Sequence, residues 1–270
     1  MKKLLYPVMN DHTYRYMQAV SKAWDIRNGS WSEPELELIP YAIKPGETVL
    51  DIGANFGLWC HYLSRHIGDG RIYAFEPVPF THQTLKQVAR LLRFRNTEVV
   101  PKGASDKAGE ITFTVPVQES GAVAAGLAYR GGRDDDRAGK ERHVRWPATR
   151  DLKGEVVAID EFLPKLERLS LIKCDIEGAE LFAFRGAERT ITEHLPTVVC
   201  EINPWYLEGF GIRLEEMTDF FFKKGYEIYH YRNDNGRGRL HCVEVSEVEE
   251  DNYVFIHPSR RERFAELLSN

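Results

Sequence analysis

The sequence predicts an α/β fold built on a doubly wound, mostly parallel β-sheet. Two observations support this class. Short apolar runs typical of buried strands alternate with segments of helical periodicity along most of the chain, which is the pattern of βαβ units. No internal repeat and no Pro- or Ser-rich linker divides the 270 residues, so we expect one domain rather than several.

The composition excludes several classes of protein. Apolar residues make up 43% and charged residues 29% of the chain, which is typical of a globular protein rather than a disordered one. A net charge of −5 argues against a nucleic-acid partner, because general nucleic-acid binders need a basic surface. No apolar run approaches the roughly 20 residues that cross a bilayer, so no membrane partner is expected.

The N-terminus and the cysteines favour a cytoplasmic location. The apolar run that begins at Leu4 is interrupted at Pro7, so it is too short for a signal peptide. The cysteines have no CxxC spacing and most lie in apolar segments, which is typical of reduced, buried thiols rather than of a disulfide or zinc framework. These cysteines are Cys60, Cys174, Cys200 and Cys242.

The first part of the chain contains the start of the sheet. Residues 1–45 form an aromatic-rich N-terminal segment of helical character, which ends at the turn Lys44-Pro45-Gly46, and the sheet domain is expected to span residues 46–270. The elements expected next are a strand at 48–52, a helix from Leu58 to Ile67, a strand at 71–75, a helix over 81–92 and a strand at 98–100.

The middle of the chain has a different pattern. Residues 110–115 alternate like a half-exposed strand, and residues 155–159 look similar. Between them we expect an inserted loop at about residues 118–154, since the stretch from Gly121 onward is rich in Gly, Arg and Asp and lacks apolar periodicity. Two interpretations of this loop stay open: a solvated excursion, or a lid that helps to bind an acceptor.

The doubly wound pattern then resumes. A buried strand at 169–174 ends at Asp175, and another at 197–200 ends at Glu201. The remaining elements expected are a helix that begins near Ala179, a helix over 214–224 and two terminal strands at 226–231 and 253–257.

A glycine-rich turn, residues 53–57, directly follows the first strand. Such a turn lets a ligand approach the backbone, and the helix after it offers unpaired N–H groups. Asn55 stands where the dinucleotide fingerprint GxGxxG has its second glycine, and no GxxxxGK[ST] loop is present, so the ligand need not carry a diphosphate. A zwitterionic amino-acid tail held by backbone groups and a carboxylate, as in S-adenosylmethionine, suits this turn better.

Glu76 lies at the carboxyl end of the second strand, about twenty residues beyond the glycine turn. An acidic side chain at this place can accept hydrogen bonds from both ribose hydroxyls of an adenosyl group. Alone, Glu76 reads as a surface glutamate before Pro77. Together, the turn and the acid favour an adenosyl-binding site.

Several acids gather where the strand at 169–174 ends, namely Asp175, Glu177 and Glu180. Ligands bind at such strand ends in open α/β sheets. Three carboxylates this close repel one another unless Lys173, a cationic ligand such as a sulfonium, or a metal compensates their charge. Capping of the following helix is the alternative, but it accounts for one acid and not for all three.

With these motifs the sequence resembles the FkbM family of S-adenosylmethionine-dependent methyltransferases, within the class I methyltransferase fold. The similarity covers most of the chain from about residue 31 onward, and KxDxEGxE at 173–180 is its most specific part. The matching segments are VLDIGANFG at 49–57, YAFEPVP at 73–79, VVAIDEFL at 156–163, LIKCDIEGAE at 171–180, FRGAE at 184–188, VVCEINP at 198–204 and NYVFIHP at 252–258.

The resemblance implies a Rossmann-like sheet of seven strands in the order 3-2-1-4-5-7-6, with the last strand antiparallel and helices on both faces. It also implies O-methylation of a hydroxyl, commonly on a sugar or secondary metabolite, with S-adenosylmethionine as donor. Trp31 and Glu33 fall where the family often has an aromatic–Glu pair. The expected donor-binding residues are Glu33, Asp51, Gly53, Asn55, Gly57, Glu76, Ser105 and Asp175.

The expected catalytic residues are carboxylates, because an aliphatic hydroxyl needs a general base or a metal near neutral pH. Asp175 is the first candidate for contact with the reacting centre, and Glu177 or Glu201 could serve as base. Asp175, Glu201 and Asn203 also form an oxygen-rich set that could hold Mg²⁺, although no residue is assigned as a metal ligand. Three aromatic residues beyond the fifth strand either stack on the acceptor or belong to the core: Trp205, Tyr206 and Phe210.

Two other classes of protein stay open. A nicotinamide-dependent oxidoreductase can use a similar sheet, but the missing GxGxxG and the presence of KxDxEGxE count against it. A non-catalytic S-adenosylmethionine-binding subunit would keep the donor site and transfer nothing. In the preferred interpretation, the partner is a small hydroxylated acceptor molecule.

Overall fold

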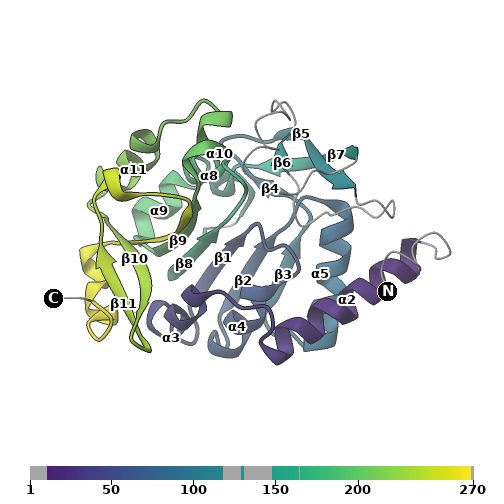
Figure 1. Cartoon of the computed structure of the whole chain (residues 1–270), viewed down its shortest axis with the longest axis horizontal. Coiled ribbons are helices and arrows are strands. Elements are labelled where there is room, and N and C mark those ends of the chain that lie inside the picture. Colours follow the sequence, from purple (N-terminus) through teal and green to yellow (C-terminus); the bar gives the residue numbers. More distant parts are fainter. Residues whose placement is uncertain (1–10, 118–128, 131–147, 164, 269–270) are drawn as a thin grey trace.

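The computed structural model describes residues 11–117, 129–130, 148–163 and 165–268. These residues form a large β-sheet with helices on both faces and a small second sheet beside it (Figure 1). The arrangement confirms the predicted α/β class. No helix in these ranges is long and apolar enough to cross a membrane.

The large sheet has eight strands within the described residues, and its order contains the predicted order 3-2-1-4-5-7-6. Five adjacent strands, from one edge of the sheet to its middle, are parallel, whereas the last strand in the sequence, β12 (Asp251–Ile256), is antiparallel to both of its neighbours. One further strand, absent from the prediction, extends the edge. In spatial order the strands are β3 (Thr97–Val100), β2 (Arg71–Phe75), β1 (Thr48–Ile52), β8 (Leu169–Cys174), β9 (Thr197–Ile202), β12 (Asp251–Ile256), β10 (Glu227–Asp234) and β11 (Arg237–Cys242).

The central strands are buried on both faces, which explains why apolar residues predominate in their sequences. Every residue of β1 and β8 is buried. Because successive side chains point to opposite faces, each strand contributes to two cores. Leu50 and Ile172 pack in one core, and Val49 and Leu171 pack in the other.

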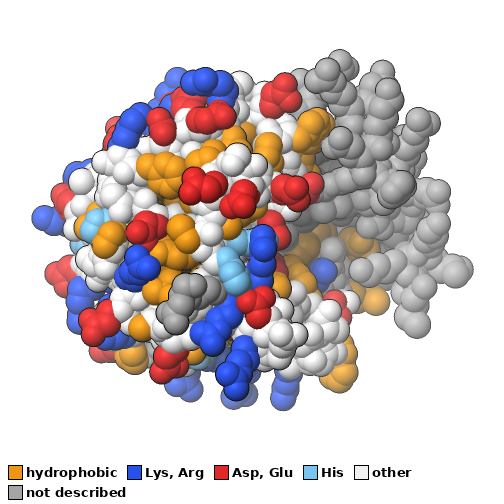
Figure 2. Space-filling model, turned by 60° about the vertical axis from the view of Figure 1, so that its left-hand side comes forward, with side chains coloured by type: hydrophobic (Ala, Val, Ile, Leu, Met, Phe, Trp, Pro, Cys, Tyr) orange, Lys and Arg blue, Asp and Glu red, His pale blue; other side chains and the backbone are white. Residues whose placement is uncertain are grey.

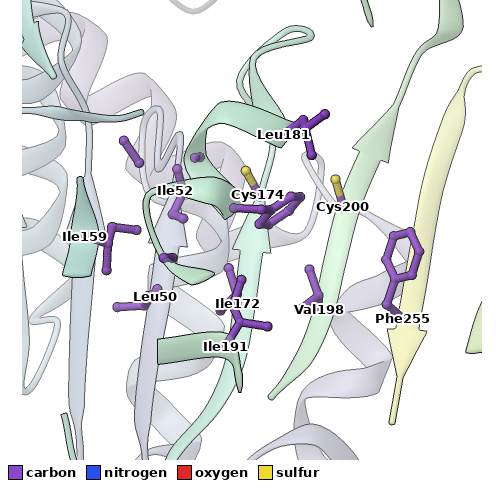
Figure 3. Packing of buried hydrophobic residues seen from close by; sticks show 14 of the residues in the cluster. Leu50, Ile52, Ile159, Ile172, Cys174, Leu181, Ile191, Val198, Cys200 and Phe255 are labelled. Carbon is purple, nitrogen blue, oxygen red and sulfur yellow. The ribbon is translucent and has the colours of Figure 1, made fainter. Parts of the chain in front are cut away.

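Helices cover each of these cores. Figure 3 shows the first core, in which Ile52, Leu181 and Phe255 pack together with other apolar side chains. Its helices are α7 (Ile159–Phe162), α8 (Glu180–Arg185), α9 (Glu188–His194) and α11 (Leu214–Phe222). The helices over the second core are α3 (Ile39–Ala42), α4 (Leu58–His66), α5 (Pro79–Leu92) and the 3₁₀ helix η5 (Pro258–Phe264).

The described part of the N-terminal segment is helical, as predicted. It contains α2 (Asp11–Asn28), the 3₁₀ helix η2 (Pro34–Leu38) and α3. Helix α2 packs against α5, and the Tyr14 and Phe80 ring centres lie 6.1 Å apart. At the other end of the segment, Glu37 accepts a hydrogen bond from the Tyr231 hydroxyl of β10. The segment therefore extends from α5, the helix between β2 and β3, to the hairpin that begins with β10.

The small sheet is built from the region that the sequence predicts as two strands around a loop. The predicted strand at 110–115 is confirmed, and so is the strand character of 155–157. The predicted loop at 118–154 is too long, because residues 148–154 pair with β5 and residues 129–130 form a short strand. The loop's other residues, 118–128 and 131–147, lie outside the described ranges. In spatial order the strands are β4 (Gly103–Ala104), β7 (Ala148–Val157), β5 (Gly109–Val117) and β6 (Tyr129–Arg130).

Strand β11, which the sequence analysis missed, follows β10 through a turn at Asn235-Gly236, where both residues have positive φ. Its sequence, RGRLHC, has no apolar alternation. A glycine is required at position 238, because a Cβ there would lie 1.7 Å from the Tyr231 hydroxyl oxygen. On the outer side of β11, the Leu240 N–H donates to the Leu267 carbonyl oxygen at 2.8 Å.

Two arginines of the C-terminal helix η5 form hydrogen bonds near the amino ends of the central strands. Arg260 donates hydrogen bonds to the carbonyl oxygens of Leu169 and His194. Arg263 donates to both carboxylate oxygens of Glu47, the residue before β1, at 2.7 and 3.0 Å. Burial opposes the charge of Glu47, but the hydrogen bonds from Arg263 outweigh it and hold the pKa of Glu47 below its usual range.

Replacing Arg263 with Met should lower the free energy of unfolding by about 2–3 kcal/mol at neutral pH, because a bidentate, partly buried ion pair is lost. The loss should vanish as the pH falls through the folded-state pKa of Glu47, since a group with a lowered pKa stabilises the fold only above that pKa. Urea unfolding over a pH series measures both effects.

The matched control is Arg261→Met, two residues earlier in the same helix. Arg261 pairs with Glu227, and these side chains are 53% and 39% exposed, against 21% and 11% for Arg263 and Glu47. An exposed pair contributes below about 1 kcal/mol. Equal losses for the two variants at neutral pH would contradict the stabilising role of Arg263.

Candidate active site

The carboxyl ends of β1, β2, β8 and β9 bring most of the predicted site residues together. In the register of β1 and β8, Asp51 lies opposite Lys173. In the register of β8 and β9, Cys174 lies opposite Cys200, so Asp175 and Glu201 follow at adjacent strand ends. This is the edge at which open α/β sheets bind their ligands.

The glycine turn depends on two left-handed glycines. Gly53 has a φ of 81°, and a Cβ there would lie 1.9 Å from the backbone oxygen of Asp175. Gly57 has a φ of 88° and begins α4, and a Cβ there would lie 2.6 Å from Leu85. Asn55, between them, has a φ of 49°, which asparagine tolerates better than most residues. Glycine at position 53 thus allows the turn to pack directly against the end of β8.

Glu76 fixes the turn from the neighbouring strand. Its side chain is buried, and its two carboxylate oxygens accept hydrogen bonds from the backbone N–H groups of Asn55 at 3.1 Å and Val78 at 2.9 Å. Burial raises the pKa of Glu76 to about 8. Each carboxylate oxygen has a second lone pair, so Glu76 retains the capacity to accept two hydroxyl groups.

Lys173 is a buried cation among these acids. Its Nζ donates to Asp175 at 3.2 Å and to the carbonyl oxygen of Gly53 at 3.4 Å. Burial opposes the charge, but the carboxylates of Asp175, Asp51 and Glu33 together raise the pKa of Lys173 above its usual range. The lysine therefore stays charged at neutral pH and compensates part of the negative charge at this edge.

Asp51 lies fully buried beneath the turn. Its Oδ2 accepts a hydrogen bond from the Cys60 thiol at 3.0 Å, whereas its Oδ1 has no hydrogen-bond partner among the described residues. Burial raises the pKa of Asp51, and the charge of Lys173 opposes this shift. A buried acceptor without a donor costs free energy, so Asp51 Oδ1 fits a ligand that brings a hydrogen-bond donor.

The N-terminal segment packs over the same turn. Glu33 accepts a hydrogen bond from Trp59 Nε1 in the first turn of α4 at 2.6 Å. The Nζ of Lys22 lies 4.6 Å from the ring centre of Trp31 and 5.4 Å from that of Phe56, which belongs to the turn. The structure therefore places Glu33 beside the predicted donor site.

The three acids after β8 have different surroundings. Glu180 is buried and accepts hydrogen bonds from the backbone N–H groups of Ile176 at 2.9 Å and Gly178 at 3.0 Å. Burial raises the pKa of Glu180 to about 7. Glu177 lies in the turn itself with a φ of 59°, and the Asp175 side chain is 37% exposed. Glu180 thus closes the turn that precedes α8 and does not cap the first turn of that helix, while Asp175 is accessible to a ligand.

Glu201 lies close to Asp175, where β9 and β8 end side by side in the sheet. Burial, together with the negative charges of Asp175, Glu177 and Glu180, raises the pKa of Glu201 well above its usual range. Glu201 therefore has a raised affinity for a proton, and it lies beside the accessible side chain of Asp175 at the edge of the sheet.

The oxygen-rich set considered for Mg²⁺ does not fit a metal. Asn203 caps α10 (Pro204–Gly209), and its Oδ1 accepts hydrogen bonds from the backbone N–H groups of Trp205 and Tyr206. Among the residues that the structure describes, no group of three or more His, Cys, Asp or Glu side chains is arranged to hold a metal ion. We therefore assign no metal role to Asp175, Glu201 and Asn203.

Two further predictions concern a serine and the aromatic residues. Ser105 has local contacts, with its hydroxyl donating to Asp106 at 3.2 Å and its backbone N–H to Val157 at 2.9 Å, so its contact with the donor stays a prediction. Of the three aromatic residues beyond the fifth strand, Tyr206 is buried, Trp205 is half-buried against it, and Phe210 packs partly buried against the first core, so stacking on the acceptor stays a prediction.

Sequence analysis missed several supporting side chains. Trp59 and Cys60 contact the predicted acids, and their position directly after the glycine turn was the available signal. Glu35 is buried and accepts a hydrogen bond from Asn252 at 3.4 Å. Asn252 lies opposite Glu201 in the register of β12 and β9. Burial raises the pKa of Glu35 to about 7. No local sequence pattern predicts the contact between Glu35 and Asn252, because 217 positions separate the two residues.

The strand order, the left-handed glycine turn after β1 and the buried acid after β2 together define a class I methyltransferase fold. The family described as the methyltransferase FkbM domain matches residues 51–228. The chain therefore belongs to the FkbM methyltransferase family, and this membership implies S-adenosylmethionine as the methyl donor. The glycine turn and the acceptor capacity of Glu76 fit an adenosyl group.

Several known proteins are similar to this chain. Methyltransferase sdnD of Sordaria araneosa is 28% identical over 199 residues, which cover 67% of this chain and 73% of sdnD. Methyltransferase 1 of Beauveria bassiana (strain ARSEF 2860) is 25% identical over 160 residues, covering 57% of this chain and 64% of that protein. Among solved structures, methyltransferase FkbM from Methylobacillus flagellatus KT gives a TM-score of 0.47 at 19% identity, covering 79% of this chain and 44% of that one.

Replacing Lys173 with Met should lower the free energy of unfolding by about 3–5 kcal/mol at pH 8, because buried carboxylates lose their cation. The loss should shrink toward pH 5, since burial raises the pKa of Asp51, which then takes up a proton in the folded state and no longer needs a cation. Urea unfolding at the two pH values measures this difference.

Lys153→Met is the matched control, because Lys153 pairs with Glu110 on the surface. It should leave the free energy of unfolding nearly unchanged at both pH values. If the loss in Lys173→Met does not depend on pH, Lys173 does not act by compensating carboxylates.

Proposed function

We propose that this protein transfers a methyl group from S-adenosylmethionine to a hydroxyl group of a small acceptor, a sugar or a secondary metabolite. Membership of the FkbM family supports methyl transfer. The observation that supports an oxygen acceptor is the presence of two neighbouring carboxyl groups beside the glycine turn, Asp175 and Glu201, because the pKa of Glu201 is raised.

The chain offers a consistent set of groups for the donor. Glu76 would accept the ribose hydroxyls, and the backbone of the glycine turn, from Gly53 to Gly57, would contact the rest of the nucleoside. Glu33 and Asp51 add negative charge next to Lys173, which favours a ligand that carries cationic groups. Asp175 completes the set, because its side chain is accessible at the adjoining strand end.

The chemistry required of the protein is modest. The bound donor supplies an electrophilic methyl group, and transfer is an in-line displacement, so the chain must mainly align the acceptor. A hydroxyl is a weak nucleophile until its proton has a place to go. Asp175 would accept this proton, and Glu201 beside it is a second candidate for the base. Burial and the neighbouring acids raise the pKa of Glu201, which suits a base that works near neutral pH.

Replacing Glu76 with Gln should weaken S-adenosylmethionine binding by about 1–3 kcal/mol, because the ribose hydroxyls lose a carboxylate acceptor. In the unsubstituted protein, affinity should rise as the pH approaches the Glu76 pKa of about 8, since the carboxylate form accepts the hydroxyls. Titration calorimetry over a pH series should show this rise, and the Glu76→Gln variant should not.

Glu98→Gln serves as the control, because Glu98 is an exposed acid on the neighbouring strand β3 and pairs with Arg71. It should bind the donor as the unsubstituted protein does. Unchanged affinity in a folded Glu76→Gln variant would remove Glu76 from the donor site.

Replacing Asp175 with Asn should lower methyl transfer by at least about 10²-fold at saturating donor, because a positioned acid–base group is lost while the shape is kept. A screen of hydroxylated sugars and natural-product scaffolds, read out as S-adenosylhomocysteine formation, first identifies an acceptor. Rates with that acceptor are then compared with those of Asp219→Asn, an exposed substitution on α11. Turnover near the original rate would make Asp175 structural and leave Glu177 or Glu201 as the base.

A further inference from the structure

Helix α2 exposes an unusual amount of apolar side chain to solvent. Trp24 is 67% exposed, Tyr16 50%, and Met17 and Val20 44% each. We call these four residues the α2 stripe. The other exposed large apolar side chains of the described residues lie singly on three different helices, and they are Leu91, Phe162 and Phe222.

The stripe is one continuous face of the helix. Tyr16, Val20 and Trp24 recur every four residues and so stand above one another on the same side. Met17 lies beside them. Every fully exposed position from Thr13 to Trp24 is uncharged. An outward helix face in water normally carries charged side chains, and this one carries none over about three turns.

The opposite face of α2 is already used within the molecule. Tyr14, Ala19, Ala23 and Ile26 are buried, and the helix packs against α5. Lys22, which reaches the glycine turn, also lies on the side away from the stripe. The stripe therefore contributes neither to the core nor to the candidate active site. A helix that is apolar on two sides is typically covered on both.

The size of the stripe is that of an interaction site. Its side chains expose on the order of 400 Å² of surface, which is the size of the largest apolar patch on a typical monomer, and such patches often mark interaction sites. By contrast, Figure 2 shows a face on which Lys, Arg, Asp and Glu side chains are scattered among the apolar ones. A dimer of standard size buries about 800 Å² per partner, around an apolar centre with a polar rim. The stripe would supply such a centre.

We propose that the α2 stripe is a dimer interface, in which α2 packs antiparallel against α2 of a second copy of this chain. The stripe has matching features on either side of Val20, with an aromatic residue four positions before it and another four positions after it. A two-fold axis at Val20 therefore places Trp24 of one copy against Tyr16 of the other. The small valine at the centre lets the helices approach, and the antiparallel arrangement opposes their dipoles favourably.

A second copy fits better than an acidic or basic partner. The stripe has no charge with which to pair such a partner, whereas a second copy brings a surface of equal size and equal lack of charge. Self-complementarity of one patch is what a two-fold symmetric dimer requires.

The test is the mass of the full chain in solution across a concentration series, by light scattering after size exclusion. The unsubstituted protein should have twice the chain mass of 31.1 kDa, and Val20→Glu should shift it to 31.1 kDa with the same thermal unfolding profile at high dilution. Phe222→Glu, an exposed apolar residue on α11, is the control and should remain dimeric. An unsubstituted protein that stays monomeric, or a dimer that survives Val20→Glu, would overturn the proposal.

Cross-linking tests the geometry independently. Near a two-fold axis the same position of both copies approaches itself, so Val20→Cys should form a disulfide-linked dimer with a mild oxidant. The experiment uses a Cys242→Ser background, because Cys242 is an exposed free thiol. Phe222→Cys in the same background should stay uncrosslinked. A dimer in which Val20→Cys fails to cross-link would overturn the antiparallel arrangement around Val20.

Discussion

A single buried lysine allows acidic side chains to gather at the carboxyl ends of the central strands. Lys173 lies among Asp51, Asp175 and Glu33, and it stays charged because these carboxylates outweigh the cost of its burial. Without a cation, carboxylates this close would repel one another or take up protons. Lys173 also donates to the carbonyl oxygen of Gly53, at the point where the glycine turn meets the end of β8. Charge compensation and close backbone packing therefore act at one place, and the candidate site is arranged around it.

The parallel sheet was predictable because burial on both faces favours apolar residues along the whole of each central strand. The runs at 48–52 and 169–174 consist mainly of apolar residues, since neither side of the strand meets water. The strands that the sequence analysis missed lack such a run of apolar residues. Residues 148–154 have a largely polar sequence, and they pair with β5. Strand β11 is rich in arginine, and the local signal for it was the Asn235-Gly236 turn, which favours a hairpin whatever the flanking residues are.

The location of the site was predictable, but the roles within it were only partly so. Acids that directly follow parallel strands must meet at one edge, so the sequence brings Asp175 and Glu201 together. It does not distinguish Asp175 from Glu180, because both are carboxylates of the same motif. Only the turn geometry shows that Glu180 is occupied by two backbone N–H groups. The contact of Glu35 with Asn252 depends on how the N-terminal segment crosses the sheet, which no local pattern encodes.

The outer edge of the sheet has a consequence for how the chain behaves in a crowded solution. An unpaired edge strand is a template on which another chain can add by hydrogen bonding, and such addition leads to aggregation. In β11, the Leu240 N–H is already bonded to the carbonyl oxygen of Leu267, so the template is interrupted within the chain itself. Arg237 and Arg239 lie on the same strand, and a second copy arriving edge to edge would meet like charge. The eighth strand thus ends the sheet in a way that resists its growth from molecule to molecule.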